Sequence, residues 1–278
     1  VRGCACRGTA GFAHVSCLAE QAKILFTEVE ENNLGDKVLV ERWRRWDTCS
    51  LCEQDYHGVV RCALGWACWK TYVGRPETYW LRMSAVRLLG NGLYDAEHNG
   101  DALVVQEAEF SMLRRAGESE DNILIAQSNL ASTYDALGRH QDAMRMSRDV
   151  YSGNLRLEGA EHEETLRAAN NYAASLIVLK RFEEAKALLR KIIPVARRVL
   201  GESHQLALRM RKVYAKALFH DAAATLDDLR EAVTTLEATE RTVRRVLGGS
   251  HPTTKAIEED LQKSRAVLRA REAPQEGA

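Results

Sequence analysis

The stretch LASTYDALGRHQDA, residues 130–143, decides the fold that this sequence predicts. It begins with a large apolar residue, Leu130, followed by an alanine, continues to an aromatic ring at Tyr134 and a glycine at Gly138, and ends at Ala143. A glycine after an apolar-periodic segment is a helix-stop signal, and an alanine lets a second helix cross close to the first. The order therefore predicts a helical hairpin that turns at Gly138.

The same hairpin recurs along the chain. Three sets of equivalent residues mark it: glycines that end an apolar-periodic segment (Gly117, Gly159, Gly201, Gly248), alanines at the helix crossing (Ala102, Ala143, Ala185, Ala232) and large residues on the first helix (Leu89, Leu130, Tyr172, Tyr214). Their spacing is 41 or 42 residues, except that the last glycine and alanine intervals are 47. The five extra residues are therefore expected in the turn around 220–225. A fixed period indicates a stacked array, here of about four hairpins between residues 80 and 248.

The order of residues in 130–143 resembles the tetratricopeptide repeat, and the Leu-Gly-x2-His endings and 42-residue period are similar to the longer repeats of kinesin light chains. The resemblance implies an α-solenoid over residues 80–271 whose concave face binds protein partners. Pro252 suits the first turn of a final capping helix. Pro194, inside a helical segment, predicts a kink or an early break. One histidine per unit predicts turn or capping residues rather than metal ligands (His162, His204, His251).

The first 80 residues have a different chemistry, because all seven cysteines and all five tryptophans lie there. Zinc takes four Cys or His ligands, and a pair separated by one to four residues can hold one edge of the metal. Six such residues come in three pairs, which predicts one Zn²⁺ site and half of another. The alternative is that they are small buried cysteines and a hydrogen-bonded core histidine. The pairs are Cys4 with Cys6, His14 with Cys17, and Cys49 with Cys52; Cys62 and Cys68 fall outside the pattern.

Residues 4–18, together with 49–52 and 56–58, resemble the RING-CH (RINGv) zinc finger, in which four ligand pairs hold two zinc ions in a cross-brace. The resemblance implies that one Zn²⁺ is bound by Cys4, Cys6, Cys49 and Cys52. It implies that His14 and Cys17 belong to a second site, whose other pair we expect upstream of residue 1. Residues 1–75 would then be a partial zinc finger and linker, in front of the repeats.

The RING-CH resemblance also implies a function: the finger recruits a ubiquitin-conjugating enzyme, the repeats bind the substrate, and no covalent catalytic residue is needed. Two departures favour the alternative, a non-enzymatic scaffold with a structural zinc finger. Gln21 stands where many RING fingers carry a tryptophan, and the loop from Cys17 to Cys49 is long. A histone-tail reader of the PHD type fits less well, because the C-x-C pair and the spacing of His14 favour RING-CH.

Composition narrows the partners. With 45% hydrophobic and 28% charged residues the chain is expected to fold, and equal numbers of basic and acidic residues, 39 each, give no net field that would attract nucleic acid or an anionic membrane. The most apolar stretch, 59–73, is shorter than the roughly 20 residues that a membrane-spanning helix needs. We therefore expect a mainly α, soluble protein of the cytoplasm or nucleus, with protein partners.

Overall fold

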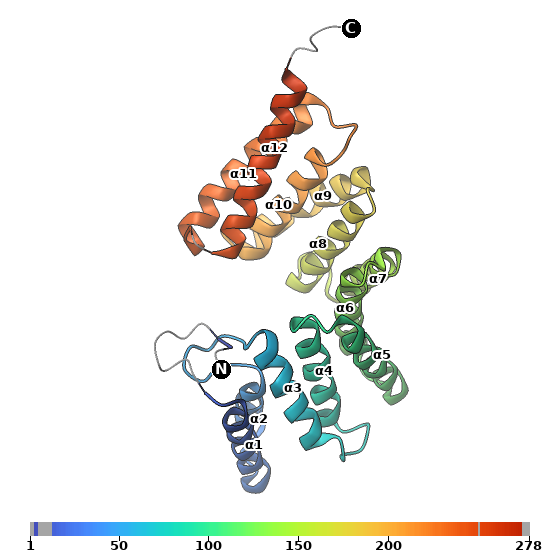
Figure 1. The fold of residues 1–278 in the computed structure, drawn as a ribbon. Helices are drawn as coiled ribbons and strands as arrows, with labels where there is room; N and C mark the ends of the chain where they lie inside the picture. Colours follow the sequence, from blue (N-terminus) through green and yellow to red (C-terminus); the bar gives the residue numbers. More distant parts are fainter. Residues whose placement is uncertain (1–2, 5–12, 250, 274–278) are drawn as a thin grey trace. The chain divides into compact units, whose positions relative to one another are not determined.

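The computed structural model describes residues 3–4, 13–249 and 251–273 (Figure 1). Twelve α-helices and one 3-10 helix lie in these ranges, without a β-strand; Thr48 and Asp55 form an isolated antiparallel bridge. The predicted mainly helical repeat fold is thus confirmed. The chain divides into two compact units, Val1–Arg139 and His140–Ala278, and each is described by itself. The division predicted from the sequence, 1–75 and 80–271, stays a prediction.

The first unit begins with helices that the sequence analysis did not predict. Residues 15–72, expected to form short segments of a finger and linker, contain α1, α2, η2 and α3. Helices α4 and α5 are the first predicted hairpin, and α6 is the first helix of the second. The bounds are α1 Val15–Asn32, α2 Asp36–Trp43, η2 Arg44–Trp46, α3 Gly58–Tyr72, α4 Trp80–Asp95, α5 Asn99–Ala116 and α6 Glu120–Ala136.

An aromatic cluster holds α1, η2 and α3 against α4. Phe26 of α1 lies in edge-on contact with Trp43, Tyr72 and Trp80, with ring centroids 5.4–6.0 Å apart. Trp46 is 2% exposed and contacts Tyr72. Buried aromatic pairs of this kind contribute about 0.5–1.5 kcal/mol each beyond the area that they bury. The expectation that Trp43 and Trp46 are packing residues is confirmed.

Helices α3 and α4 approach each other closely at two glycines. A Cβ atom on Gly65 of α3 would lie 2.8 Å from the carbonyl oxygen of Leu88, and one on Gly92 of α4 would lie 2.8 Å from that of Arg61. The sequence analysis interpreted Gly92 as a packing residue rather than part of a dinucleotide loop, and this contact agrees. Because each glycine faces backbone, the separation of the two helices depends on both.

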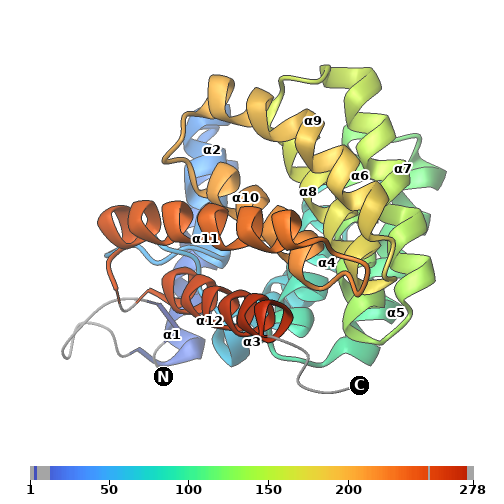
Figure 2. The same ribbon diagram turned by 90° about the horizontal axis from the view of Figure 1, so that it is seen from above.

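The second unit contains the rest of the array: α7 His140–Glu158, α8 Glu163–Val178, α9 Phe182–Leu200, α10 Gln205–Phe219, α11 Leu226–Leu247 and α12 Pro252–Glu272. The crossing alanines Ala185 and Ala232 are fully buried, as predicted. The extra residues of the last hairpin lie between α10 and α11, also as predicted. Helix α12 begins at Pro252 and lies along α11 (Figures 1 and 2), which confirms the capping helix. The early break considered at Pro194 is wrong, because α9 runs through that residue.

The recurring Leu-Gly-x2-His ending is a compact helix-to-helix connection. At Gly201, φ is 90° and the amide N–H still donates to the carbonyl of Arg197, so the residue closes α9 in a conformation that favours glycine. Three residues later, Nδ1 of His204 accepts from the amide N–H of Leu206 at 3.3 Å and caps α10. His162 and His251 cap α8 and α12 in the same way. The prediction that these histidines are capping residues is confirmed.

Candidate metal centre

Cys49 and Cys52 lie in a narrow turn between η2 and α3. The amide N–H of Cys49 donates to the carbonyl of Gln54 at 2.9 Å, and that of Glu53 donates to the carbonyl of Cys49 at 3.0 Å. Glu53 has a φ of 55°, in the left-handed region that a non-glycine residue seldom adopts. The Thr48–Asp55 bridge closes the base of the turn. This backbone holds both thiols of the C-x2-C pair within reach of one metal ion.

Cys4 comes to the same turn from the other end of the unit's sequence. The carbonyl of Gly3 accepts from the amide N–H of His57 at 2.9 Å, which ties the segment to the residue before α3. A Cβ atom on Gly3 would lie 2.7 Å from both methyl carbons of Val60, so only glycine allows the chain to pass this close to α3. Cys4 itself is buried, at 7% exposure.

The Sγ atoms of Cys4, Cys49 and Cys52 all lie within 4.8 Å of one another. A tetrahedral zinc with Zn–S bonds of about 2.3 Å requires sulfur atoms about 3.8 Å apart, so small side-chain adjustments would let the three bind one ion. These are three of the four ligands predicted for the complete site. The fourth, Cys6, lies outside the described residues. The side chains present therefore fit a structural zinc, and they form the one cluster of three or more such ligands among the described residues.

The surroundings favour the thiolate form of Cys49. Burial raises the pKa of this thiol, but the amide groups of Cys52 and Leu51 and the thiols of Cys4 and Cys52 outweigh burial and lower the pKa to about 6. Burial and the neighbouring Cys49 and Cys4 raise the pKa of Tyr56, so its phenol stays protonated. Zinc binds the thiolate, and a thiol that ionises near neutral pH loses its proton to the metal easily.

The other sequence-predicted ligands lie apart from this cluster. Nδ1 of His14 is 3.9 Å from Sγ of Cys17, and both side chains are exposed at the start of α1. No third ligand joins them among the described residues, so a second zinc site stays a prediction. Cys62 and Cys68 both lie in α3, outside the cluster. Cys68 is fully buried and burial raises its pKa, which makes it an ordinary core residue.

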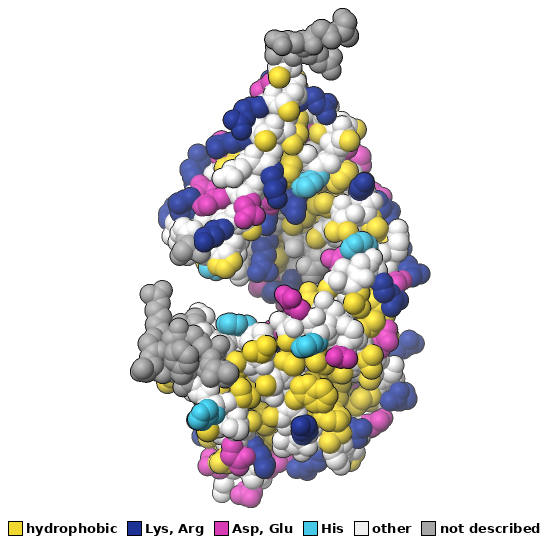
Figure 3. All heavy atoms as spheres, in the orientation of Figure 1, with side chains coloured by type: hydrophobic (Ala, Val, Ile, Leu, Met, Phe, Trp, Pro, Cys, Tyr) yellow, Lys and Arg dark blue, Asp and Glu magenta, His cyan; other side chains and the backbone are white. Residues whose placement is uncertain are grey.

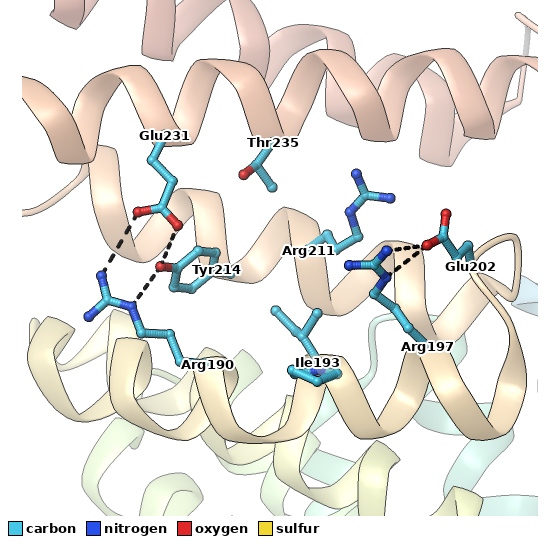
Figure 4. A pocket seen from close by; sticks show the side chains of 9 residues that line it. Arg190, Ile193, Arg197, Glu202, Arg211, Tyr214, Glu231 and Thr235 are labelled. Carbon is cyan, nitrogen blue, oxygen red and sulfur yellow. Dashed lines mark hydrogen bonds and ion pairs between the residues drawn. The ribbon is translucent and has the colours of Figure 1, made fainter.

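The structure also contains a pocket that the sequence analysis did not predict. It has a volume of about 360 Å³ and lies in the second unit, with α10 as its floor and α9 and α11 as its walls (Figure 4). Arg190 and Arg197 of α9, which the sequence suggested were part of a solvated basic face, point into it. Arg211 of α10 was not singled out. No motif surrounds it, and the signal that would have found it is its place in the repeat.

Comparison with known proteins supports the repeats. The tetratricopeptide family profile matches residues 123–164 and 165–206, two consecutive units of the predicted 42-residue length. No curated protein matches the chain in sequence. The membrane prediction also has a structural counterpart: none of the helices in the described ranges combines the length and apolarity that crossing a bilayer requires.

Several solved structures share the fold. BtubC (BKLC) from P. vanneervenii is similar over 96% of this chain and 97% of its own, with a TM-score of 0.53 and 13% identity. A Podosopora anserina protein named for kinesin light chain and for its nearly identical TPR-like repeats covers 84% of this chain and 98% of its own, with a TM-score of 0.56 and 16% identity. Residues 123–206 are therefore tetratricopeptide repeats, and the chain has the fold of kinesin-light-chain-type repeat proteins.

Proposed function

We propose that the chain is a zinc-binding scaffold for protein–protein interaction. The tetratricopeptide repeats supply the interaction surface, because stacked helical hairpins bind extended or helical segments of partner proteins. Zn²⁺ bound by Cys4, Cys6, Cys49 and Cys52 would fasten the N-terminal segment to the turn before α3. The observation that carries the zinc assignment is the convergence of three thiols from positions 45 residues apart in sequence.

The metal's role in this proposal is structural. A site with four cysteine ligands leaves no open position for water or substrate, so the zinc would contribute folding free energy rather than catalysis. Cys4 and Cys49 are buried, and without a metal their thiols are held close together with little solvent to screen a charge on either. Zinc removal should therefore release the segment around Cys4 first.

Limited proteolysis of the full chain with and without a zinc chelator tests this role. We expect the N-terminal segment to become sensitive on zinc removal and in Cys49→Ser, whereas Cys68→Ser, a buried cysteine of α3 outside the cluster, keeps the protected pattern. Identical cleavage with and without the chelator would contradict the structural role.

Ubiquitin transfer is a second candidate function, and one observation favours it. Cys4 clusters with Cys49 and Cys52, while His14 and Cys17 form a separate pair. This is the partition that the RING-CH cross-brace implies. In such a ligase the finger would hold a charged ubiquitin-conjugating enzyme and the repeats would select the substrate. Against it, Gln21 is exposed on α1 where many RING fingers place a tryptophan.

Autoubiquitination by the zinc-loaded chain, assayed with a panel of conjugating enzymes, separates the two candidates. A ligase should show activity that is lost in Cys49→Ser and retained in Cys68→Ser. If no conjugating enzyme supports transfer while the protein still binds zinc, the scaffold function stands alone.

A further inference from the structure

The pocket between α9 and α11 contains three arginines and two glutamates, and two of the arginines are already paired. Nε of Arg190 donates to the hydroxyl of Tyr214 at 2.8 Å, and that hydroxyl donates to Oε1 of Glu231 at 2.8 Å. Nε of Arg197 donates to Oε1 of Glu202 at 3.1 Å. These contacts stand at the two ends of the pocket (Figure 4). They neutralise Arg190 and Arg197.

Arg211 is the arginine that remains. It rises from α10 in the middle of the pocket, between Arg197 and Thr235 (Figure 4), and no hydrogen bond or ion pair joins it to another described residue. Its side chain is half-buried. Burial and the charge of Arg197 lower its pKa, with Glu202 acting in the opposite direction, so the folded protein disfavours this charge. The pocket thus has one positive charge in excess.

The repeat register shows that this charge is a local departure from the array. Positions three residues before Leu89, Leu130 and Tyr172 are equivalent to Arg211, and they are occupied by Val86, Gln127 and Ala169. Val86 and Ala169 are buried, at 6% and 0% exposure. The hairpin packing therefore needs no charge here, and a half-buried guanidinium without a counterion is unfavourable for folding.

We propose that this pocket binds the side-chain carboxylate of an acidic residue in a partner protein, with Arg211 as the ligand-binding group. The proposal rests on the interaction function of the repeats and adds the chemistry of one contact. A planar guanidinium can donate two parallel hydrogen bonds to a carboxylate, and such charge-assisted pairs are strong when desolvated. Glu202 and Glu231 flank the site and would repel a dianion, so a single negative charge fits better than a phosphate.

Mixed charges elsewhere in the unit do not offer the same opportunity. Along α11 and α12, basic and acidic side chains are interspersed (Figure 3), and Arg244 and Arg265 are paired with Glu240, Glu258 and Glu237. Arg241 lines the groove there together with these pairs. It provides a matched control, since it is an arginine of the same unit outside the proposed pocket.

The test is an NMR titration of the arginine Nε–H signals of the full chain with N-acetyl-glutamate N-methylamide, which carries one carboxylate. The signal of Arg211, identified by its loss in Arg211→Met, should shift saturably. Arg241→Met should retain that shift, and inorganic phosphate should bind more weakly than the carboxylate probe. In Arg211→Met, where the signals of Arg190 and Arg197 report binding, the affinity should fall about tenfold or more, as expected for loss of a charge-assisted hydrogen bond.

The thermal midpoint of Arg211→Met distinguishes binding from a structural role. Methionine keeps the apolar stem and removes the buried charge, so the variant should melt at the same or a higher temperature than the parent. A lower midpoint, no saturable shift, or tighter phosphate binding would each overturn the proposal. The readout needs neither zinc nor ubiquitin, and Cys49→Ser should bind the probe normally. Failure of the metal centre and failure of this pocket are therefore separate outcomes.

Discussion

Adding one methyl group at Gly92 should force α3 and α4 apart. The new Cβ would lie 2.8 Å from both the carbonyl oxygen of Arg61 and Cα of Cys62. Both are backbone atoms in the middle of a regular helix, and no rotamer change can move them away. The matching contact of Gly65 with Leu88 and Leu89 fixes the same helix pair from the other side. The strain in Gly92→Ala therefore cannot be relieved locally.

The magnitude follows from two opposing effects. Overpacking costs about 1–3 kcal/mol, and the upper end applies here because backbone blocks relaxation. Alanine is favoured over glycine within a helix by about 1 kcal/mol. The free energy of unfolding of the first unit should therefore fall by about 2 kcal/mol in Gly92→Ala.

Urea unfolding followed by tryptophan fluorescence measures this change directly, because all five tryptophans lie in the first 80 residues and report on the first unit. Gly100→Ala is the matched control. Gly100 lies in α5, and a methyl group added there would meet no neighbouring side chain or helix within 4 Å, so this variant should be as stable as the parent or more stable by up to about 1 kcal/mol. If Gly92→Ala were as stable as Gly100→Ala, the close approach of α3 and α4 would be refuted.

Three further changes test other parts of the structure. His204→Ala removes the cap of α10 and should cost about 1 kcal/mol in thermal unfolding, whereas His204→Asp, which can cap the same amide, should lose much less; equal losses would contradict the capping role. Burial raises the pKa of Glu109 above 4.5, against the opposing effect of Arg87, so its contribution to stability is present below pH 4.5 and is lost as pH rises through the raised pKa. Glu109→Gln should remove that part of the pH dependence in urea midpoints measured at about pH 5 and about pH 7, and unchanged dependence would count against it. Pro194→Ala restores an amide N–H inside α9 and should raise the melting temperature of the second unit; a lower one would mean that the proline is accommodated without cost.

The sequence predicted the features of the repeats that depend on short-range interactions. A glycine that closes a helix and a histidine that caps the next one act within a few residues, so Gly201 and His204 could be interpreted from their spacing. The crossing alanines, such as Ala185, followed from the same period. These features were confirmed because every unit repeats the same local geometry.

The helices of residues 15–72 and the role of Arg211 could not be predicted in the same way. The packing of Phe26 against Trp43, Tyr72 and Trp80 joins residues far apart in sequence, and the ligand pattern of the cysteines drew attention away from the helical segments between them. Arg211 resembles any basic residue on a helix until its burial and its register are known. Convergence of Cys4 with the C-x2-C turn was implied by family resemblance, and the geometry agrees for the described ligands.

Zinc content is the measurement that tests the central claim most directly. Metal analysis of the full chain purified in the presence of zinc should find about one Zn²⁺ per chain, bound by the four-cysteine site. Cys4→Ser and Cys49→Ser should lose it, and Cys68→Ser should keep it. A chain without zinc, or a zinc content that Cys49→Ser leaves unchanged, would contradict the assignment of this cluster as a metal centre.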